Sequence, residues 1–140
     1  MKTILILHIF TTVFMTGLCW FVQIVHYPLF KVIDYNKFPA YERKNAITGF
    51  ITIPIMTIEL ISGLILLYYY PENLYLINIV LLVFIWLSTM IFQVPIHLKL
   101  MSEGDPKLII KVIRTNWIRT LSWTARSIVL ILILWELIDY

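Results

Sequence analysis

The chain has 140 residues, of which 61% are hydrophobic and only 14% are charged. A soluble domain of this size could not bury so large an apolar fraction, so the composition excludes a soluble globular protein and predicts a protein of the lipid bilayer. The formal net charge of +3 comes mainly from basic residues beside the apolar stretches, and we expect no nucleic-acid partner.

Three apolar stretches lie at residues 4–30, 47–69 and 74–97. Each can cross a hydrocarbon core about 30 Å thick, because a helix rises about 1.5 Å per residue. The first runs past the length of a signal-peptide core and has no A-x-A-like cleavage site, so we expect it to be retained. A fourth stretch, residues 115–137, is polar in its first half. The sequence therefore predicts an all-α, transmembrane four-helix up-down bundle, with residues 1–140 as a single domain.

Local signals refine the ends of these helices. Asp105 followed by Pro106 is typical of a helix start, so we expect the fourth helix to begin well before its membrane span. The segment FPAYERKN, residues 38–45, predicts a short helix at the membrane surface. Pro54 and Pro95 lie inside spans, where we expect kinks.

The basic residues are distributed unevenly between the loops. The second loop, residues 70–73, contains Glu72 and no Lys or Arg, whereas the first and third loops and their flanks contain eight of the eleven basic residues. Because Lys and Arg favour the cytoplasmic side, we expect a cell-membrane protein with both termini outside the cytoplasm. The eight residues are Lys31, Lys37, Arg43, Lys44, Lys99, Lys107, Lys111 and Arg114.

Each predicted span carries a stripe of polar residues along one face, at about 100° per residue. Lipid offers these side chains no hydrogen-bond partner, so we expect the stripes to face one another inside the bundle. The stripes consist of His8, Thr12, Met15, Cys19 and His26 with Gln23 at the edge, then Thr52, Glu59 and Gly63, then Trp86, Thr89, Gln93 and His97, and finally Asn116, Arg119, Trp123 and Arg126.

Several stripe residues lie at similar depths, about 5 to 10 Å from the expected cytoplasmic ends of their helices. We predict that they form one layer around an intramembrane binding site near the cytoplasmic side, with Asn116 beside them. The layer consists of Gln23, His26, Gln93, His97 and Arg119.

Glu59 and Arg126 lie deeper, about 15 to 18 Å from the same side. A lone charge at this depth costs at least about 2.5 kcal/mol, so we predict that the two side chains form an ion pair. The pair either fixes the register of two helices or takes part in chemistry, and the sequence leaves both readings open.

Four segments of the chain resemble a widespread family of small, functionally uncharacterised bacterial membrane proteins with four helices. They are LHIFTTVFMTGLCWFVQIVHYPLF, IPIMTIELISGLILL, IWLSTMIFQVPIHLKL and TNWIRTLSWTAR. More distantly, the arrangement is similar to anthrone oxygenase-like membrane proteins and to HemJ-type protoporphyrinogen oxidases, in which His8 would match an early histidine and Pro28 a proline that follows it. This resemblance implies haem or porphyrin handling.

Two classes of function fit these residues. In the first, the protein is a redox protein that binds haem b, with His26 and His97 as axial ligands, His8 as a further candidate iron ligand, and Arg119 near a propionate. A quinone or an anionic head group could occupy the same layer instead, held by Arg119.

In the second class, the protein is a non-enzymatic accessory subunit or a carrier of a small ligand. Four helices without an internal repeat are few for a transporter with alternating access. Whether the protein is an enzyme, and whether it forms a homo-oligomer or joins a larger membrane complex, is left open by the sequence.

Overall fold

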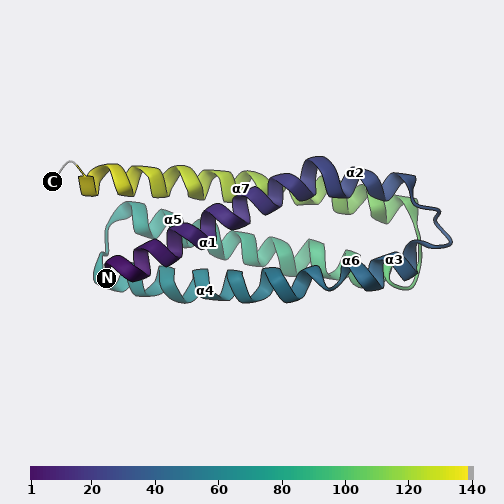
Figure 1. Ribbon diagram of the computed structural model, residues 1–140, viewed down its shortest axis with the longest axis horizontal. Helices are drawn as coiled ribbons and strands as arrows, with labels where there is room; N and C mark the ends of the chain where they lie inside the picture. Colours follow the sequence, from purple (N-terminus) through teal and green to yellow (C-terminus); the bar gives the residue numbers. More distant parts are fainter. Residues whose placement is uncertain (139–140) are drawn as a thin grey trace.

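The computed structural model describes residues 1–138 and contains four long helical rods, with no strand among these residues (Figure 1). The first and third rods each include several helical segments. In chain order, the rods are α1 (Lys2–Phe21), η1 (Val22–His26), α2 (Tyr27–Leu29) and η2 (Phe30–Val32); α3 (Phe38–Asn45) and α4 (Thr48–Tyr69); α5 (Asn73–Ser88), η3 (Thr89–Gln93) and α6 (Val94–Leu100); and α7 (Pro106–Ile138).

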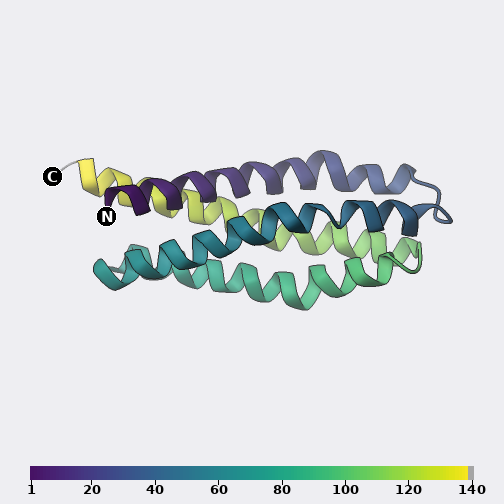
Figure 2. The ribbon, with the colours of Figure 1, turned by 60° about the horizontal axis from the view of Figure 1, so that its bottom comes forward.

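The rods run alternately up and down and are arranged as a ring. Helix α1 packs against α4 and α7, and α5 packs against the same two neighbours (Figures 1 and 2). Both described chain ends lie at the same end of the bundle. The predicted all-α four-helix bundle is therefore confirmed.

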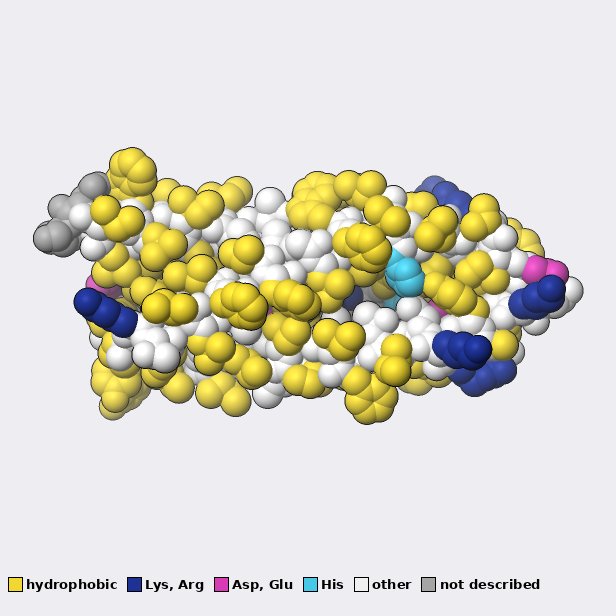
Figure 3. All heavy atoms as spheres, viewed as in Figure 1, with side chains coloured by type: hydrophobic (Ala, Val, Ile, Leu, Met, Phe, Trp, Pro, Cys, Tyr) yellow, Lys and Arg dark blue, Asp and Glu magenta, His cyan; other side chains and the backbone are white. Residues whose placement is uncertain are grey.

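Each rod is long and apolar enough to cross a membrane. The helical segments span 28 to 33 residues, with a mean hydropathy between 1.7 and 2.4 in their most apolar windows. Large apolar side chains point outward along their length, including Phe10 and Phe50, which are 67% and 82% exposed (Figure 3). Because water would oppose such a surface, the fold is compatible with an integral membrane protein.

The predicted helix boundaries agree with the structure at two positions. Helix α3 covers the residues of FPAYERKN. At the start of α7, the Asp105 side chain accepts a hydrogen bond from the backbone N–H of Lys107, with 2.8 Å between Oδ1 and N. This contact satisfies one of the free donors at the helix start, as an N-cap residue should.

Two π-helical segments, η1 and η3, interrupt the first and third rods. Each is followed within two residues by a proline, Pro28 or Pro95. A proline ring would collide with the carbonyl one turn earlier, and an inserted residue that widens the turn relieves this collision. Pro54 lies within α4, which continues on both sides of it.

One end of the bundle, here called the basic end, contains the loops at residues 33–37 and 101–105. Most Lys and Arg side chains gather there (Figure 3). The two loops touch at Gly104, where a Cβ atom would collide with the backbone of Tyr35. Next to the loops, a buried cluster that includes Phe30, Phe38 and Leu100 closes this end of the core.

Candidate ligand-binding cavity

A cavity of about 250 Å³ lies between the four rods, in the half of the bundle nearest the basic end. All four rods contribute to its walls. The apolar side chains of the lining include Met15, Leu18, Cys19, Val22, Met56 and Trp86, and the polar ones include His26, Glu42, Asn45, Gln93, His97, Asn116 and Arg119.

The cavity has a mouth on the side of the bundle, between α4 and the η3–α6 segment. Four of its lining residues there are between 38% and 59% exposed, although they lie within membrane-length rods. Figure 3 also shows a hollow in this half of the surface, with a histidine side chain (cyan) at its edge. The residues at the mouth are Ile53, Met90, Val94 and Leu98.

A chain of short hydrogen bonds joins Glu42, His97 and Tyr27 on the cavity wall. The Nδ1 atom of His97 lies 2.6 Å from Oε1 of Glu42, which is fully buried. On the other side of the ring, Nε2 lies 3.0 Å from the hydroxyl oxygen of Tyr27. Because a carboxylate only accepts, Nδ1 donates to Glu42, and the Tyr27 hydroxyl also lies 3.3 Å from the side-chain oxygen of Gln93, to which it can donate.

The Glu42 carboxylate also orders the neighbouring part of α3. The amide nitrogen of Asn45 lies 3.3 Å from Oε2 of Glu42, and its carbonyl oxygen lies 3.0 Å from Nε2 of His26. Both predicted histidines are therefore bound to α3, His26 through Asn45 and His97 through Glu42.

A second group of contacts joins η1 to α7. The side-chain amide of Asn116 donates to Oε1 of Gln23 over 2.9 Å. Nη1 of Arg119 lies 3.4 Å from Oδ1 of the same Asn116 side chain. The other predicted amide, Gln93, donates to Thr115 at 3.0 Å. Of the predicted layer, His26, Gln93, His97 and Arg119 line the cavity together with Asn116, whereas Gln23 lies outside the lining and is bonded to Asn116.

The two π-helical segments help to place these residues. Gln23 and His26 belong to η1, and Gln93 ends η3, so the extra residue in each turn shifts which side chains face inward. Gln23 and Gln93 are 4% and 3% exposed as a result.

Some buried donors near the cavity have no partner among the described residues. They are Nε of Arg119, Nε1 of Trp86 and Nε1 of Trp123, whereas no buried side-chain acceptor of the described lining residues lacks a partner. A buried N–H without a hydrogen bond costs about 1 to 3 kcal/mol. The unmet demand of the lining is therefore for hydrogen-bond acceptors.

Beyond the cavity, farther from the basic end, the structure contains the Glu59–Arg126 pair. Nη1 of Arg126 lies 3.0 Å from Oε1 of Glu59, and both side chains are fully buried. Thr12 donates to the same carboxylate oxygen over 2.6 Å, and Asn78 accepts from Nη2 of Arg126 over 3.0 Å. The guanidinium also lies 4.6 Å from the centre of the Trp123 ring.

His8 belongs to this second network and not to the cavity. It is 2% exposed, with Nδ1 2.9 Å from the Ser62 hydroxyl and Nε2 3.1 Å from the Asn78 side-chain oxygen. Its surroundings therefore satisfy both ring nitrogens.

The geometry of the three histidines does not suit axial ligation of haem iron. Each nitrogen of His97 and of His8 lies within hydrogen-bond distance of a protein group, and Nε2 of His26 is bonded to Asn45. In residues 1–138, no group of three or more His, Cys, Asp or Glu side chains could hold a metal ion. Haem b thus stays a prediction of the sequence alone, and we derive no chemistry through it.

Two cavity residues, Glu42 and Tyr27, are absent from the predicted site. The sequence places Glu42 in a surface helix, yet Phe38, one turn earlier on the same face, is fully buried and draws Glu42 inward. Tyr27 lies beside Pro28 at the end of a span, a position typical of an interfacial aromatic residue, but it is only 4% exposed.

Comparison of the chain with protein-family models, curated proteins and solved structures gives no match. The site is therefore interpreted from its own chemistry.

Proposed function

We propose that the protein is an integral membrane protein that binds a quinone-type ligand in this cavity. One observation carries the proposal: among the buried side-chain atoms of a largely apolar cavity open at the side of the bundle, two donors, Arg119 Nε and Trp86 Nε1, lack a partner and no acceptor does. A quinone head group offers carbonyl acceptors, and its apolar tail can remain in lipid at the mouth.

The charges of the lining favour a neutral head group over a phosphate or a carboxylate. Glu42 and Arg119 are the acidic and the basic residue of the cavity lining, and their formal charges cancel. An anion would add an uncompensated charge to a site with few water-exposed groups, whereas a carbonyl oxygen adds none.

The hydrogen-bond chain gives the site a means of handling protons. The side chain of His97 is 22% exposed and that of Glu42 1% exposed, and His97 lies between Glu42 and the Tyr27 hydroxyl. His97, the partly exposed member, can exchange a proton with Glu42 on one side and with Tyr27 on the other, both of which lie on the cavity wall. Such a path suits a ligand whose oxygens are protonated when it is reduced.

The test concerns Arg119, and its matched control is Arg114, an exposed arginine on the same helix. We expect Arg119→Lys to weaken binding of a decyl-substituted benzoquinone about tenfold, because losing one charge-assisted hydrogen bond costs about 1.4 kcal/mol or more. Arg114→Lys should bind like the wild type. Binding is measured by tryptophan fluorescence in vesicles that contain increasing amounts of the quinone.

Absence of saturable quinone binding to the wild-type protein would overturn the proposed function. Equal quinone affinity of Arg119→Lys and Arg114→Lys would instead show that Arg119 does not contact the quinone. Saturable binding of a fatty acid but not of the quinone would identify an anionic head group. A visible haem spectrum in protein purified from cells supplied with a haem precursor, lost in His26→Ala or His97→Ala, would replace the quinone by haem.

We also propose that the basic end faces the cytoplasm and that both chain ends lie outside it. The proposal rests on the bias of Lys and Arg toward the basic end, where eight of the eleven lie in the two loops and in the helix ends that flank them. A periplasmic reporter fused to the C-terminus should be active, and a cytoplasmic reporter at that position inactive. The reverse result would invert the orientation and place the cavity in the outer leaflet.

A further inference from the structure

The sulfur-containing side chains of the protein gather around the cavity. The chain has five methionines and one cysteine, and Met1 is the only one of the six that does not line the cavity. The others come from three rods and the loop after α6, and they are Met15, Cys19, Met56, Met90 and Met101. Methionine adapts to irregular gaps, but this explanation applies equally to apolar cores elsewhere in the bundle, which contain no methionine.

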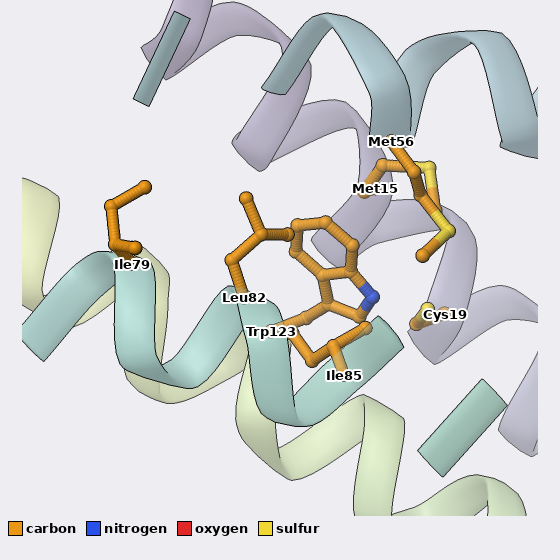
Figure 4. Close-up of a cluster of buried hydrophobic side chains, with 7 residues drawn as sticks. All are labelled: Met15, Cys19, Met56, Ile79, Leu82, Ile85 and Trp123. Carbon is orange, nitrogen blue, oxygen red and sulfur yellow. The ribbon is translucent and has the colours of Figure 1, made fainter. Parts of the chain in front are cut away.

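Three of these side chains form the deep end of the cavity. Met15, Cys19 and Met56 are 0%, 3% and 2% exposed and belong to one buried cluster with Trp123. Figure 4 shows their sulfur atoms on the same side of the Trp123 ring, from α1 and α4. The cluster thus presents two thioethers and one thiol to a space that is connected to the mouth.

The Trp123 indole gives an independent observation. Its Nε1 atom is buried and has no hydrogen-bond partner among the described residues, and Figure 4 shows this nitrogen facing the sulfur atoms. A neutral thiol or thioether is a weak acceptor, whereas a thiolate is a strong one. The orphan donor is therefore suited to a deprotonated Cys19.

We propose that Met15, Cys19 and Met56 bind a Cu(I) ion. Thioether and thiolate sulfur are the soft ligands that Cu(I) prefers. A thiolate alone would be a costly charge in this apolar interior, and a monovalent cation neutralises it. Binding releases the thiol proton and involves no change in the oxidation state of the ion. Met90 at the mouth and Met101 in the loop at residues 101–105 supply further thioethers on the cavity wall.

The site does not depend on the quinone proposal, because it uses different residues. The donors assigned to the quinone belong to Arg119 and Trp86, whereas the copper ligands lie on α1 and α4 next to Trp123. Either proposal can fail while the other holds.

The experiment measures Cu(I) affinity of the reduced, purified protein in detergent by competition with bicinchoninate. We expect one Cu(I) per chain, with quenching of tryptophan fluorescence on binding. Met15→Leu and Met56→Leu each conserve volume and should weaken binding at least tenfold, and Cys19→Ser should weaken it further. Ile128→Leu is the control, because Ile128 is exposed and lies outside the cavity, and it should bind like the wild type.

Thermal unfolding of each variant checks that the fold is retained. Cu(I) binding that is lost in Cys19→Ser but unchanged in Met15→Leu and Met56→Leu would show binding by an isolated thiol and would overturn the proposal. So would binding that none of the three substitutions weakens, or a wild-type protein that fails to compete with bicinchoninate.

Discussion

Replacing Glu59 by Gln is expected to destabilise the protein by about 3 kcal/mol. The substitution keeps the size of the side chain but removes the negative charge that lies 3.0 Å from Arg126. Arg126 is fully buried, so its charge cannot reach water or the membrane surface. Asn78 still accepts a hydrogen bond from Arg126, and Thr12 can still donate one to the side-chain oxygen at position 59. Neither residue carries a charge that would compensate Arg126.

A double-mutant cycle measures this dependence. Glu59→Gln together with Arg126→Gln should recover part of the lost stability, because no uncompensated charge remains. Thermal unfolding in one detergent gives all four stabilities, and Glu103→Gln, at an exposed loop position, is a control that should have little effect. A coupling energy near zero would mean that the two charges are stabilised separately and that their contact is incidental.

The bundle itself could be predicted because the membrane restricts the choices. Any apolar segment of sufficient length must form a helix to satisfy its backbone, so the four rods follow from hydropathy alone. The inward direction of the polar stripes follows from the same restriction. This restriction predicts that His8, Glu59 and Arg126 point into the bundle, and all three side chains are buried in the structure.

The details of the cavity depend on features with weak sequence signals. A π-helical turn differs from an α-helical turn by one residue, and both satisfy the backbone, so Pro95 predicts a disturbance without its form, and none was predicted at Pro28. The widened turns set which side chains face the cavity. Depth along an ideal helix could therefore predict the level of Gln23 and Gln93 but not their partners, Asn116 and Thr115.

The position of α3 was the other unpredictable element. A short amphipathic helix after a loop can lie flat on the membrane surface or pack against the end of the bundle, and its own sequence does not distinguish the two positions. In this structure Phe38 of α3 packs against Phe30, with ring centres 5.3 Å apart, so α3 packs against the end of the bundle. Glu42 then reaches His97, although the two residues are 55 positions apart.

Gly63 should be the least replaceable glycine of the rods. It lies inside α4, where a Cβ atom would come within 2.5 Å of Cδ1 of Ile79 and 2.9 Å of Cε1 of His8. The isoleucine methyl group can rotate away, but the His8 ring is fixed by hydrogen bonds at both nitrogens. We expect Gly63→Ala to cost about 1 to 3 kcal/mol, which is typical of overpacking a filled interior.

Gly17 provides the matched control, since it also lies inside a helix, α1, and a Cβ atom there would meet nothing within 4 Å. Gly17→Ala should be neutral or stabilising by up to about 1 kcal/mol, because alanine is the better helix former. Thermal unfolding compares the two variants directly. Adding Ile79→Val to Gly63→Ala removes the collision with the Ile79 Cδ1 atom. Any loss of stability that persists in this double variant is then due to the collision with the His8 ring. Full recovery in that double variant would show that the ring can move, and a Gly63→Ala protein as stable as Gly17→Ala would show that the helices separate freely at this point.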